Sequence, residues 1–280
     1  MMAASALCRA ANVPLVLDGC RFAENAHFIR SREPGMADMS IVEIVQAMSP
    51  LFDMMTMSAK KDGLSNTGGW LALRDQYLAE RLKGRLIMTE GFTTYGGMAG
   101  RDMAAIAVGL VEVTDPNYLE YRTGFVQYVV DKLQALGVPV LVPAGGHAVY
   151  LDASAMLPAV PRDQFPGHAV ACALYLEGGL RSCEIGSLMF GAGAADSGRP
   201  ELVRLAFPRR MYTRSHLEFA IEVCVRVHEL CKAGAISGME ITHGAESPLR
   251  HFSAKLKPLA STYAPEHGRS DGQHAEGLHA

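Results

Sequence analysis

Two adjacent lysines follow an apolar run and precede a turn that contains glycine. Residues 52–57 form the run, Lys60 and Lys61 follow after Ser58 and Ala59, and Gly63 lies in the turn. Lysine side chains are mostly exposed in proteins, and repulsion between like charges, together with partial burial, favours the neutral amine. A neutral lysine amine can form a Schiff base with an aldehyde cofactor. The alternative is that Lys60 and Lys61 are a pair of solvated loop side chains.

A second stretch has residues that could hold such a cofactor. Residues 13–17 predict a short buried parallel strand, which ends at Asp18 and is soon followed by Arg21. Ligands of open α/β sheets bind at the carboxyl ends of strands. The aldehyde cofactor pyridoxal phosphate (PLP) needs a carboxylate at its pyridinium nitrogen, which Asp18 can supply, and Arg21 can donate to the ring hydroxyl. The alternatives are a helix N-cap for Asp18 and a surface salt bridge for Arg21.

Further runs, taken in order, resemble the tryptophanases of the β-eliminating lyase family. They cover roughly positions 10–257 and read DGCRFAENAHFI, SIVEIV, TMSAKKDGLSNTGG, EGFTTYGGMAGRDM, AGGHAVYLDA, DQFPGHAVACALYLEGGLRSCEIGS, VRLAFPRRMYT and LRHFSAKLK. Many separate motifs in one order make the resemblance specific. It implies a PLP-dependent carbon–carbon lyase of tryptophan catabolism, which converts L-tryptophan and water to indole, pyruvate and ammonia by α,β-elimination. Tyrosine phenol-lyase, or another β-eliminating amino-acid lyase, is the alternative enzyme.

The resemblance implies roles around the lysine pair. Lys61 matches the family's Schiff-base lysine, which also moves the α-proton of the substrate, and Lys60 matches a neighbour that organises water. Asp18 matches the partner of the pyridine nitrogen, and Arg21 matches the residue near the ring oxygen. Ser58 matches a serine that contacts the phosphate, and its alternative is an ordinary hydroxyl at the end of a strand.

The resemblance also implies contacts to the substrate and to a cation. Arg204 matches the arginine that binds the amino-acid carboxylate through two parallel charge-assisted bonds. Ile185 stands where tyrosine phenol-lyase has an arginine that meets the phenol ring, so an indole leaving group is favoured. Cys183 replaces a small aliphatic residue, and His251 matches a histidine near the active site, with a satisfied surface histidine as the alternative. The main-chain carbonyl of Asn66 matches a ligand of potassium.

Composition limits the class of protein. The 280 residues are 49% hydrophobic and 20% charged, as in soluble globular proteins, and the net charge of −3 gives no basis for binding nucleic acid or an anionic membrane. The six cysteines lack metal-ligand spacing and lie mostly in apolar runs, which favours reduced thiols and a cytoplasmic location. No apolar run reaches the roughly eighteen residues of a membrane-spanning helix.

Short apolar strands that alternate with helices predict an α/β fold. The resemblance implies that residues 1–137 are the C-terminal part of a cofactor-binding large domain, with a mainly parallel sheet like that of aspartate aminotransferase. Residues 138–259 are expected to form a smaller α+β domain, and residues 260–280 a disordered tail. Apolar runs at 86–89 and 138–142 predict two further strands.

The chain lacks segments that family members carry. Family members carry a long N-terminal portion with a glycine-rich phosphate loop and an aromatic residue that stacks on the cofactor, and the segment 191–198 is shorter here than the family loop. We therefore expect a truncated chain that binds PLP weakly and has little activity. The family forms homotetramers with shared active sites. The alternative outside the enzymes is therefore a catalytically silent fragment, which acts only by assembly with intact subunits.

Overall fold

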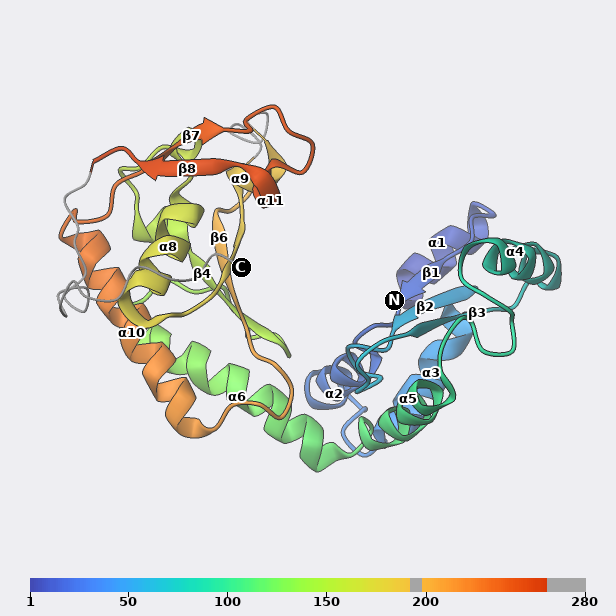
Figure 1. Ribbon diagram of the computed structural model, residues 1–280. Helices are drawn as coiled ribbons and strands as arrows, with labels where there is room; N and C mark the ends of the chain where they lie inside the picture. The colour runs from blue at the N-terminus through green and yellow to red at the C-terminus, as the bar shows by residue number, and fades with distance from the viewer. Residues whose placement is uncertain (192–197, 261–280) are drawn as a thin grey trace. The chain divides into compact units, whose positions relative to one another are not determined.

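Two compact units make up the chain in the computed structural model, which describes residues 1–191 and 198–260 (Figure 1). One unit contains residues 1–123 and the other begins at Gly124. Helix α6 (Pro116–Ala135) belongs in part to each of them. The domain boundary expected at residue 137 stays a prediction. The expected tail lies outside the described residues, apart from Ala260, and so does most of the segment 191–198.

The first unit is built on a three-stranded sheet in the order β1-β2-β3. Strands β1 (Val16–Asp18) and β2 (Met54–Ser58) are parallel, and β3 (Gly69–Leu73) is antiparallel to β2. The carboxyl ends of β1 and β2 therefore lie at the same edge of the sheet. Helix α2 (Phe22–Arg32) begins shortly after β1, and the two lysines follow β2.

A small apolar core holds helices α2 and α3 (Ile41–Met48) together in this unit. Ala23 and Ala26 of α2 and Ile44 of α3 are among its buried side chains. The remaining helices of the unit are α1 (Met2–Ala10), the 3-10 helix η1 (Ser49–Leu51), α4 (Gln76–Thr89) and α5 (Gly100–Glu112).

The strand expected over residues 86–89 is wrong, because these residues form the last turn of α4. The helix begins at Asp75, whose carboxylate accepts a hydrogen bond from the Leu78 N–H at 2.7 Å, and its hydrogen bonds continue to the end. None of the described residues of α4 is buried, and Ile87 and Met88 are 53% and 85% exposed. An apolar run this short does not distinguish a strand from a helix.

The strand expected over residues 138–142 is also wrong. Only Val140 pairs, in an isolated antiparallel bridge with Leu151, although the Leu141 N–H also donates to the Tyr150 carbonyl at 2.9 Å. Pro139 lacks an N–H and cannot donate to a ladder, so the pairing does not extend into a strand.

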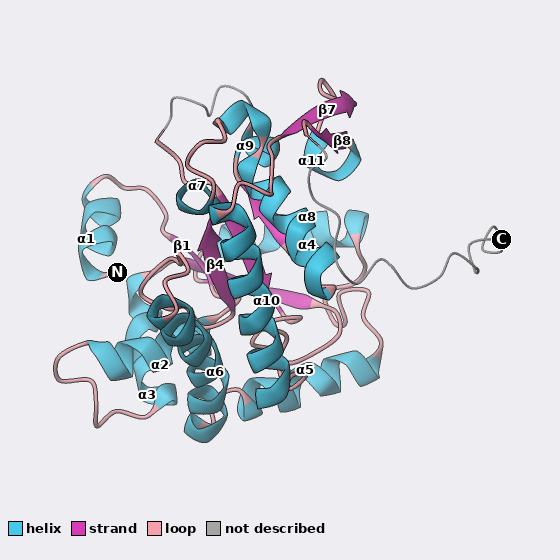
Figure 2. Cartoon of the chain, turned by 90° about the vertical axis from the view of Figure 1, so that its left-hand side faces the viewer, coloured by secondary structure: helices cyan, strands magenta, loops and turns pink. Residues whose placement is uncertain are grey.

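The second unit contains an antiparallel sheet in the order β4-β6-β5 and a two-stranded sheet β7-β8. Figure 2 labels β4 and the pair β7 and β8. The strands are β4 (Ala148–Asp152), β5 (Cys183–Ile185), β6 (Leu202–Ala206), β7 (Met239–His243) and β8 (Lys255–Pro258). The helices are α7 (Ala153–Met156), the 3-10 helix η2 (Arg162–Gln164), α8 (Pro166–Gly178), α9 (Ser187–Phe190), α10 (Arg214–Lys232) and α11 (Arg250–Ser253). No helix in the described part of the chain is long and apolar enough to cross a membrane.

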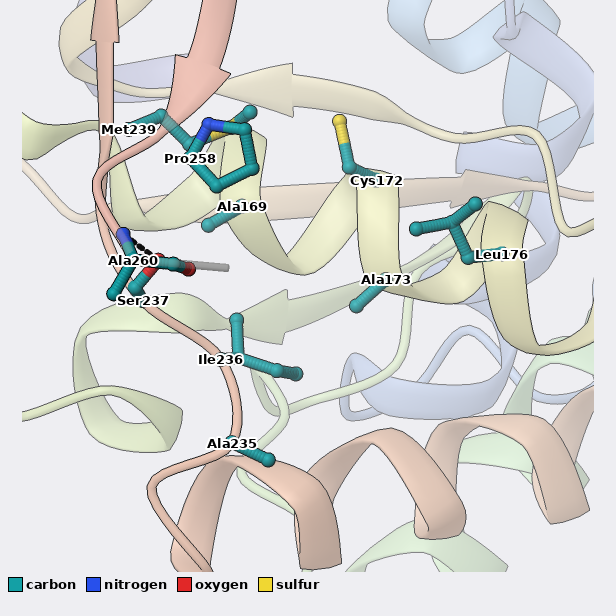
Figure 3. Close-up of a pocket in the computed structure, with 10 residues that line it drawn as sticks. All are labelled: Ala169, Cys172, Ala173, Leu176, Ala235, Ile236, Ser237, Met239, Pro258 and Ala260. Atoms are coloured by element: carbon teal, nitrogen blue, oxygen red, sulfur yellow. Dashed lines mark hydrogen bonds between the residues drawn. The ribbon is translucent and has the colours of Figure 1, made fainter. Parts of the chain in front are cut away.

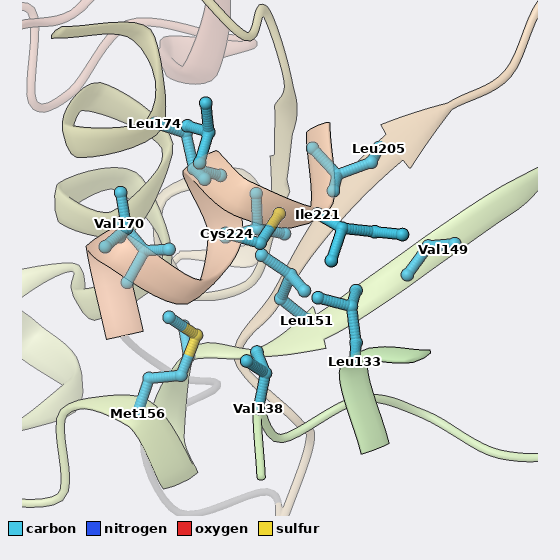
Figure 4. Packing of buried hydrophobic residues seen from close by; sticks show 14 of the residues in the cluster. Leu133, Val138, Val149, Leu151, Met156, Val170, Leu174, Leu205, Ile221 and Cys224 are labelled. Carbon is cyan, nitrogen blue, oxygen red and sulfur yellow. The ribbon is translucent and has the colours of Figure 1, made fainter. Parts of the chain in front are cut away.

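The core of this unit lies between one face of the β4-β6-β5 sheet and helices α8 and α10 (Figure 4). Val149 and Leu151 of β4 are buried there, while Tyr150 between them points to the other face. Burial raises the pKa of the Cys224 thiol in α10 to about 12, so this thiol stays protonated and unreactive.

Two buried glutamates hold the turn between β5 and α9. Oε1 of Glu184 accepts a hydrogen bond from the Leu188 N–H at 3.1 Å, and Oε1 of Glu201 accepts one from the Ser187 N–H at 2.9 Å. Nη2 of Arg162 lies 3.0 Å from Oε1 of Glu201. Burial, reinforced by the negative charge of Glu201, raises the pKa of Glu184 to about 7.

We expect Glu184→Gln to stabilise the protein above pH 7 and to change its stability little below pH 4.5. Because the folded-state pKa of about 7 exceeds the ordinary value of 4.5, the folded state binds more protons between these values, and its stability falls as the pH rises through them. Glutamine resembles the neutral acid and removes this loss, which amounts to about 3 kcal/mol once the pH exceeds the folded-state pKa. The measurement is denaturant unfolding of both proteins at about pH 5 and pH 8.

The control for this prediction is Glu43→Gln at the exposed start of α3. Hydrogen bonds from Ser40 lower the pKa of Glu43, so this variant should show no gain at alkaline pH. A difference between Glu184→Gln and wild type that is equal at both pH values would contradict the role given to the charge of Glu184.

Candidate active site

The loops that follow β1 and β2 are bonded to each other at the carboxyl edge of the sheet. Asp18, the last residue of β1, lies opposite Thr56, two residues before Ser58. The Gly19 N–H donates to the Thr56 carbonyl at 2.8 Å, and the Ser58 N–H donates to Sγ of Cys20 at 3.2 Å. Asp18 and Ser58 are therefore at the same edge of the sheet.

Asp18 is held in its ionised form. Hydrogen bonds from the side chain and the backbone of Cys20 lower its pKa, and the positive charges of Lys61 and Arg21 lower it further. The backbone bond runs from the Cys20 N–H to Oδ1 at 3.0 Å. An exposed carboxylate that stays ionised at neutral pH can pair with a protonated ring nitrogen.

The two lysines occupy different environments. The turn begins at Ala59, which is buried and whose N–H donates to the Gly68 carbonyl at 3.0 Å, and the Lys61 N–H donates to the Ser58 carbonyl at 3.2 Å. Lys60 is exposed, whereas Lys61 is half-buried and its charge acts on Asp18. Lys61 is therefore the lysine of the pair that shares its surroundings with Asp18.

Arg21 has a donor without a hydrogen-bond acceptor among the described residues. Its Nε is buried and lies 3.9 Å from Oε2 of Glu24, which is beyond hydrogen-bonding distance. A ligand oxygen at this position would satisfy it. An ionised Asp18, a half-buried Lys61, this donor and the hydroxyl of Ser58 match what PLP requires at its nitrogen, aldehyde, ring oxygen and phosphate. The residues present thus fit the cofactor.

Three of the residues expected to bind substrate lie on one face of the β4-β6-β5 sheet. Arg204 lies directly opposite Cys183 of β5 and Tyr150 of β4, and Ile185 follows two positions after Cys183 on the same face. Arg204 and Ile185 are half-buried and Cys183 is exposed. The sequence reasoning missed Tyr150, whose place on this face the alternation around Val149 and Leu151 could have indicated.

His251 belongs to a different part of the second unit. It lies in α11 and lines a hollow of about 300 Å³ together with Met189 and Phe190 of the α9 region. Its neighbour Arg250 donates to the carbonyls of Ser187 at 2.7 Å and Leu188 at 2.9 Å, which ties α11 to α9. The structure thus places His251 beside α9.

The expected potassium ligand, Asn66, is exposed in the loop between β2 and β3. Within residues 1–191 and 198–260, no three His, Cys, Asp or Glu side chains gather in a way that could hold a metal ion. A main-chain carbonyl site for potassium would need no such cluster, so this assignment stays a prediction.

Two further cavities, one in each unit, differ greatly in volume. In the first unit, residues 67–71, 93–98 and parts of α4 line a hollow of about 880 Å³. In the second unit, Cys172, Ile236 and Met239 line a largely apolar cavity of about 90 Å³ (Figure 3). Pockets for small molecules commonly measure roughly 300–1,000 Å³, so the smaller cavity cannot take an aromatic amino acid.

Comparison of sequences identifies relatives along nearly the whole chain. The model of the family described as beta-eliminating lyase matches residues 1–222. The tryptophanase of Salinibacter ruber is 52% identical over 275 residues, which cover 96% of this chain and 57% of that protein. The tryptophanase of Rhodobacter capsulatus is 53% identical over 250 residues, which cover 88% and 54%. The tyrosine phenol-lyase of Intrasporangium calvum is 42% identical over 269 residues, which cover 95% and 56%.

The chain thus spans about half the length of the curated relatives it matches. Among solved structures, Sphingomonas wittichii serine palmitoyltransferase has a TM-score of 0.51 at 14% identity, over 83% of this chain and 51% of that one. A structure of SPT with PLP has a TM-score of 0.54 at 14% identity, over 82% and 51%. At such low identity the likeness concerns the fold alone, and it confirms the expected partial PLP-transferase-like α/β fold. The family match confirms the resemblance seen in the sequence: the chain belongs to the β-eliminating lyase family.

Proposed function

We propose that the chain carries the functional residues of a tryptophanase, which converts L-tryptophan and water to indole, pyruvate and ammonia. The observation that carries this proposal is the gathering of Lys61, Asp18 and Arg21 at one edge of the first sheet. Identities of 52% and 53% to two tryptophanases, against 42% to a tyrosine phenol-lyase, support tryptophan as the substrate.

Each residue at this edge would have its own role in binding PLP or in transferring protons. When bound, PLP withdraws electrons from the α-carbon of the amino acid and makes its proton acidic. Nζ of Lys61 would hold the cofactor's aldehyde carbon and later accept the α-proton. Asp18 would keep the ring nitrogen protonated, Arg21 would donate to the ring oxygen, and Ser58 would donate to the phosphate. Lys60, which is exposed, would organise water.

The residues of the second unit would recognise the substrate. The guanidinium of Arg204 suits the amino-acid carboxylate because its two N–H donors match the two carboxylate oxygens. Ile185 on the same face offers an apolar surface to indole, and Cys183 beside it would adjust the shape of that surface. His251, which lies beside α9, would be the histidine near the active site that the resemblance implies.

We also propose a potassium ion at the Asn66 carbonyl, a homotetramer and a cytoplasmic location. Carbonyl oxygens suit a hard monovalent cation, and the tetramer follows from the resemblance to the tryptophanases. All six cysteines lie in described parts of the chain and are free thiols, as expected in a reducing compartment.

The first test of the cofactor site is the absorbance of the purified chain with added PLP. We expect a band near the visible edge that Lys61→Ala abolishes, since only Lys61 would bond to the aldehyde. The control is Lys60→Ala, which should keep the band. A band that persists in Lys61→Ala would refute the assignment. No band in the folded wild type would favour the silent fragment over an active lyase.

The second test concerns the leaving group. We expect Ile185→Arg to lower kcat/KM for indole release by about tenfold or more, because a guanidinium beside an apolar ring loses hydration without a partner. The control is Leu136→Arg, at an exposed position of the same unit, which should leave the rate unchanged. If Ile185→Arg and wild type release indole equally fast, Ile185 does not contact the leaving group. The argument against tyrosine phenol-lyase activity would then be lost.

A further inference from the structure

The turn that carries Lys61 is attached to helix α2 through the next residue, Asp62. The side chain of Asp62 is completely buried. Its Oδ2 accepts hydrogen bonds from the N–H groups of Ala23 at 2.8 Å and Glu24 at 3.2 Å. These N–H groups belong to the first turn of α2, where the helix itself supplies no acceptors and a negative charge is favoured.

The backbone of Asp62 makes a second connection to the same region. Its N–H donates to the Cys20 carbonyl at 3.1 Å. Cys20 in turn donates from its own N–H to Asp18 at 3.0 Å and accepts from the Ser58 N–H at 3.2 Å. Asp62 therefore joins the turn after β2 to the loop after β1, which holds Asp18 and Arg21.

The opposite side of the turn rests on helix α5 without intervening side chains. A Cβ atom added to Gly109 of α5 would lie 2.0 Å from the carbonyl oxygen of Gly63, and one added to Gly63 would lie 2.7 Å from Cα of Ala59. Both positions therefore require glycine, and backbone packs directly on backbone. The turn is held between α5 and the Asp62 connection.

An ordinary helix cap does not account for this arrangement. Capping side chains commonly come from the residue just before a helix, as Asp75 does for α4 through a 2.7 Å bond to the Leu78 N–H. Asp62 instead comes from 39 positions beyond Ala23 and directly follows Lys61. Its loss would release the lysine turn and the start of α2 together.

We infer that Asp62 is a positioning residue, which fixes the turn so that Nζ of Lys61 is presented to the carboxyl edge beside Asp18. This inference rests on the proposed function, in which Lys61 bonds to PLP. It assigns Asp62 no contact with cofactor or substrate.

The experiment traps the lysine adduct and identifies its position. The chain is mixed with PLP, reduced with borohydride so that the C=N bond becomes a stable secondary amine, and mapped by mass spectrometry for label at Lys61 and Lys60. Asp62→Ala should lower the Lys61 to Lys60 ratio about tenfold, because small misplacements of a nucleophile have large effects on its rate. Asp62→Asn keeps an acceptor oxygen and should give an intermediate ratio. Asp75→Ala removes a comparable cap from α4 and should leave the ratio unchanged.

Amide hydrogen exchange on the same proteins separates this inference from the proposed function. Asp62→Ala should lose protection at the amides of Ala23, Glu24 and Lys61, while α3 keeps its protection. Label absent from Lys61 in the wild type would count against the proposed function, and the exchange result alone would then test whether Asp62 holds the turn to α2.

An unchanged Lys61 to Lys60 ratio in folded Asp62→Ala, or unchanged protection of the Lys61 amide, would overturn the inference. If Asp62→Ala does not fold, a ratio in Asp62→Asn equal to that of wild type overturns it, and a lower ratio supports it.

Discussion

The parallel pairing of β1 with β2 is the constraint on which the candidate site depends. Because both strands run in the same direction, the residues that leave their carboxyl ends meet at one edge of the sheet. Asp18 leaves one strand and the lysine turn leaves the other, so two segments about forty residues apart share one environment. An antiparallel pairing of the same strands would place the lysine turn at the opposite edge.

Electrostatics and hydrogen bonding then give this edge its chemical character. Hydrogen bonds from Cys20 lower the pKa of Asp18 and keep this carboxylate ionised, and the charges of Lys61 and Arg21 add a smaller contribution. In the second unit, the alternation of β4, β5 and β6 separates a buried inner face, which is apolar apart from Glu184, from a face with Arg204, Cys183 and Ile185. Each unit therefore presents one group of candidate site residues on a sheet or directly after its strands.

The sequence predicted those features that depend on local pattern. The ends of β1 and β2 could be located because apolar runs stop at Asp18 and Ser58, and Lys61 follows three positions after Ser58. The connection made by Asp62 could not be predicted, because an aspartate after two lysines is typical of a turn and its partners lie 39 positions earlier in the chain. The buried pair Glu184 and Glu201 was missed for the same reason, since only folding brings them together. The false strand at 86–89 shows that a short apolar run does not specify its own secondary structure.

Helix α4 has a consequence for how the first unit comes apart. A helix of 14 residues is marginal in water on its own, and the described residues of α4 contribute no buried side chain to offset its loss of chain entropy. Its unfolding would therefore leave the paired strands and the α2–α3 core intact. Helix α4 should therefore unfold before the paired strands do, and a protease added to the native chain should cleave α4 well before it reaches the turn that carries Lys61.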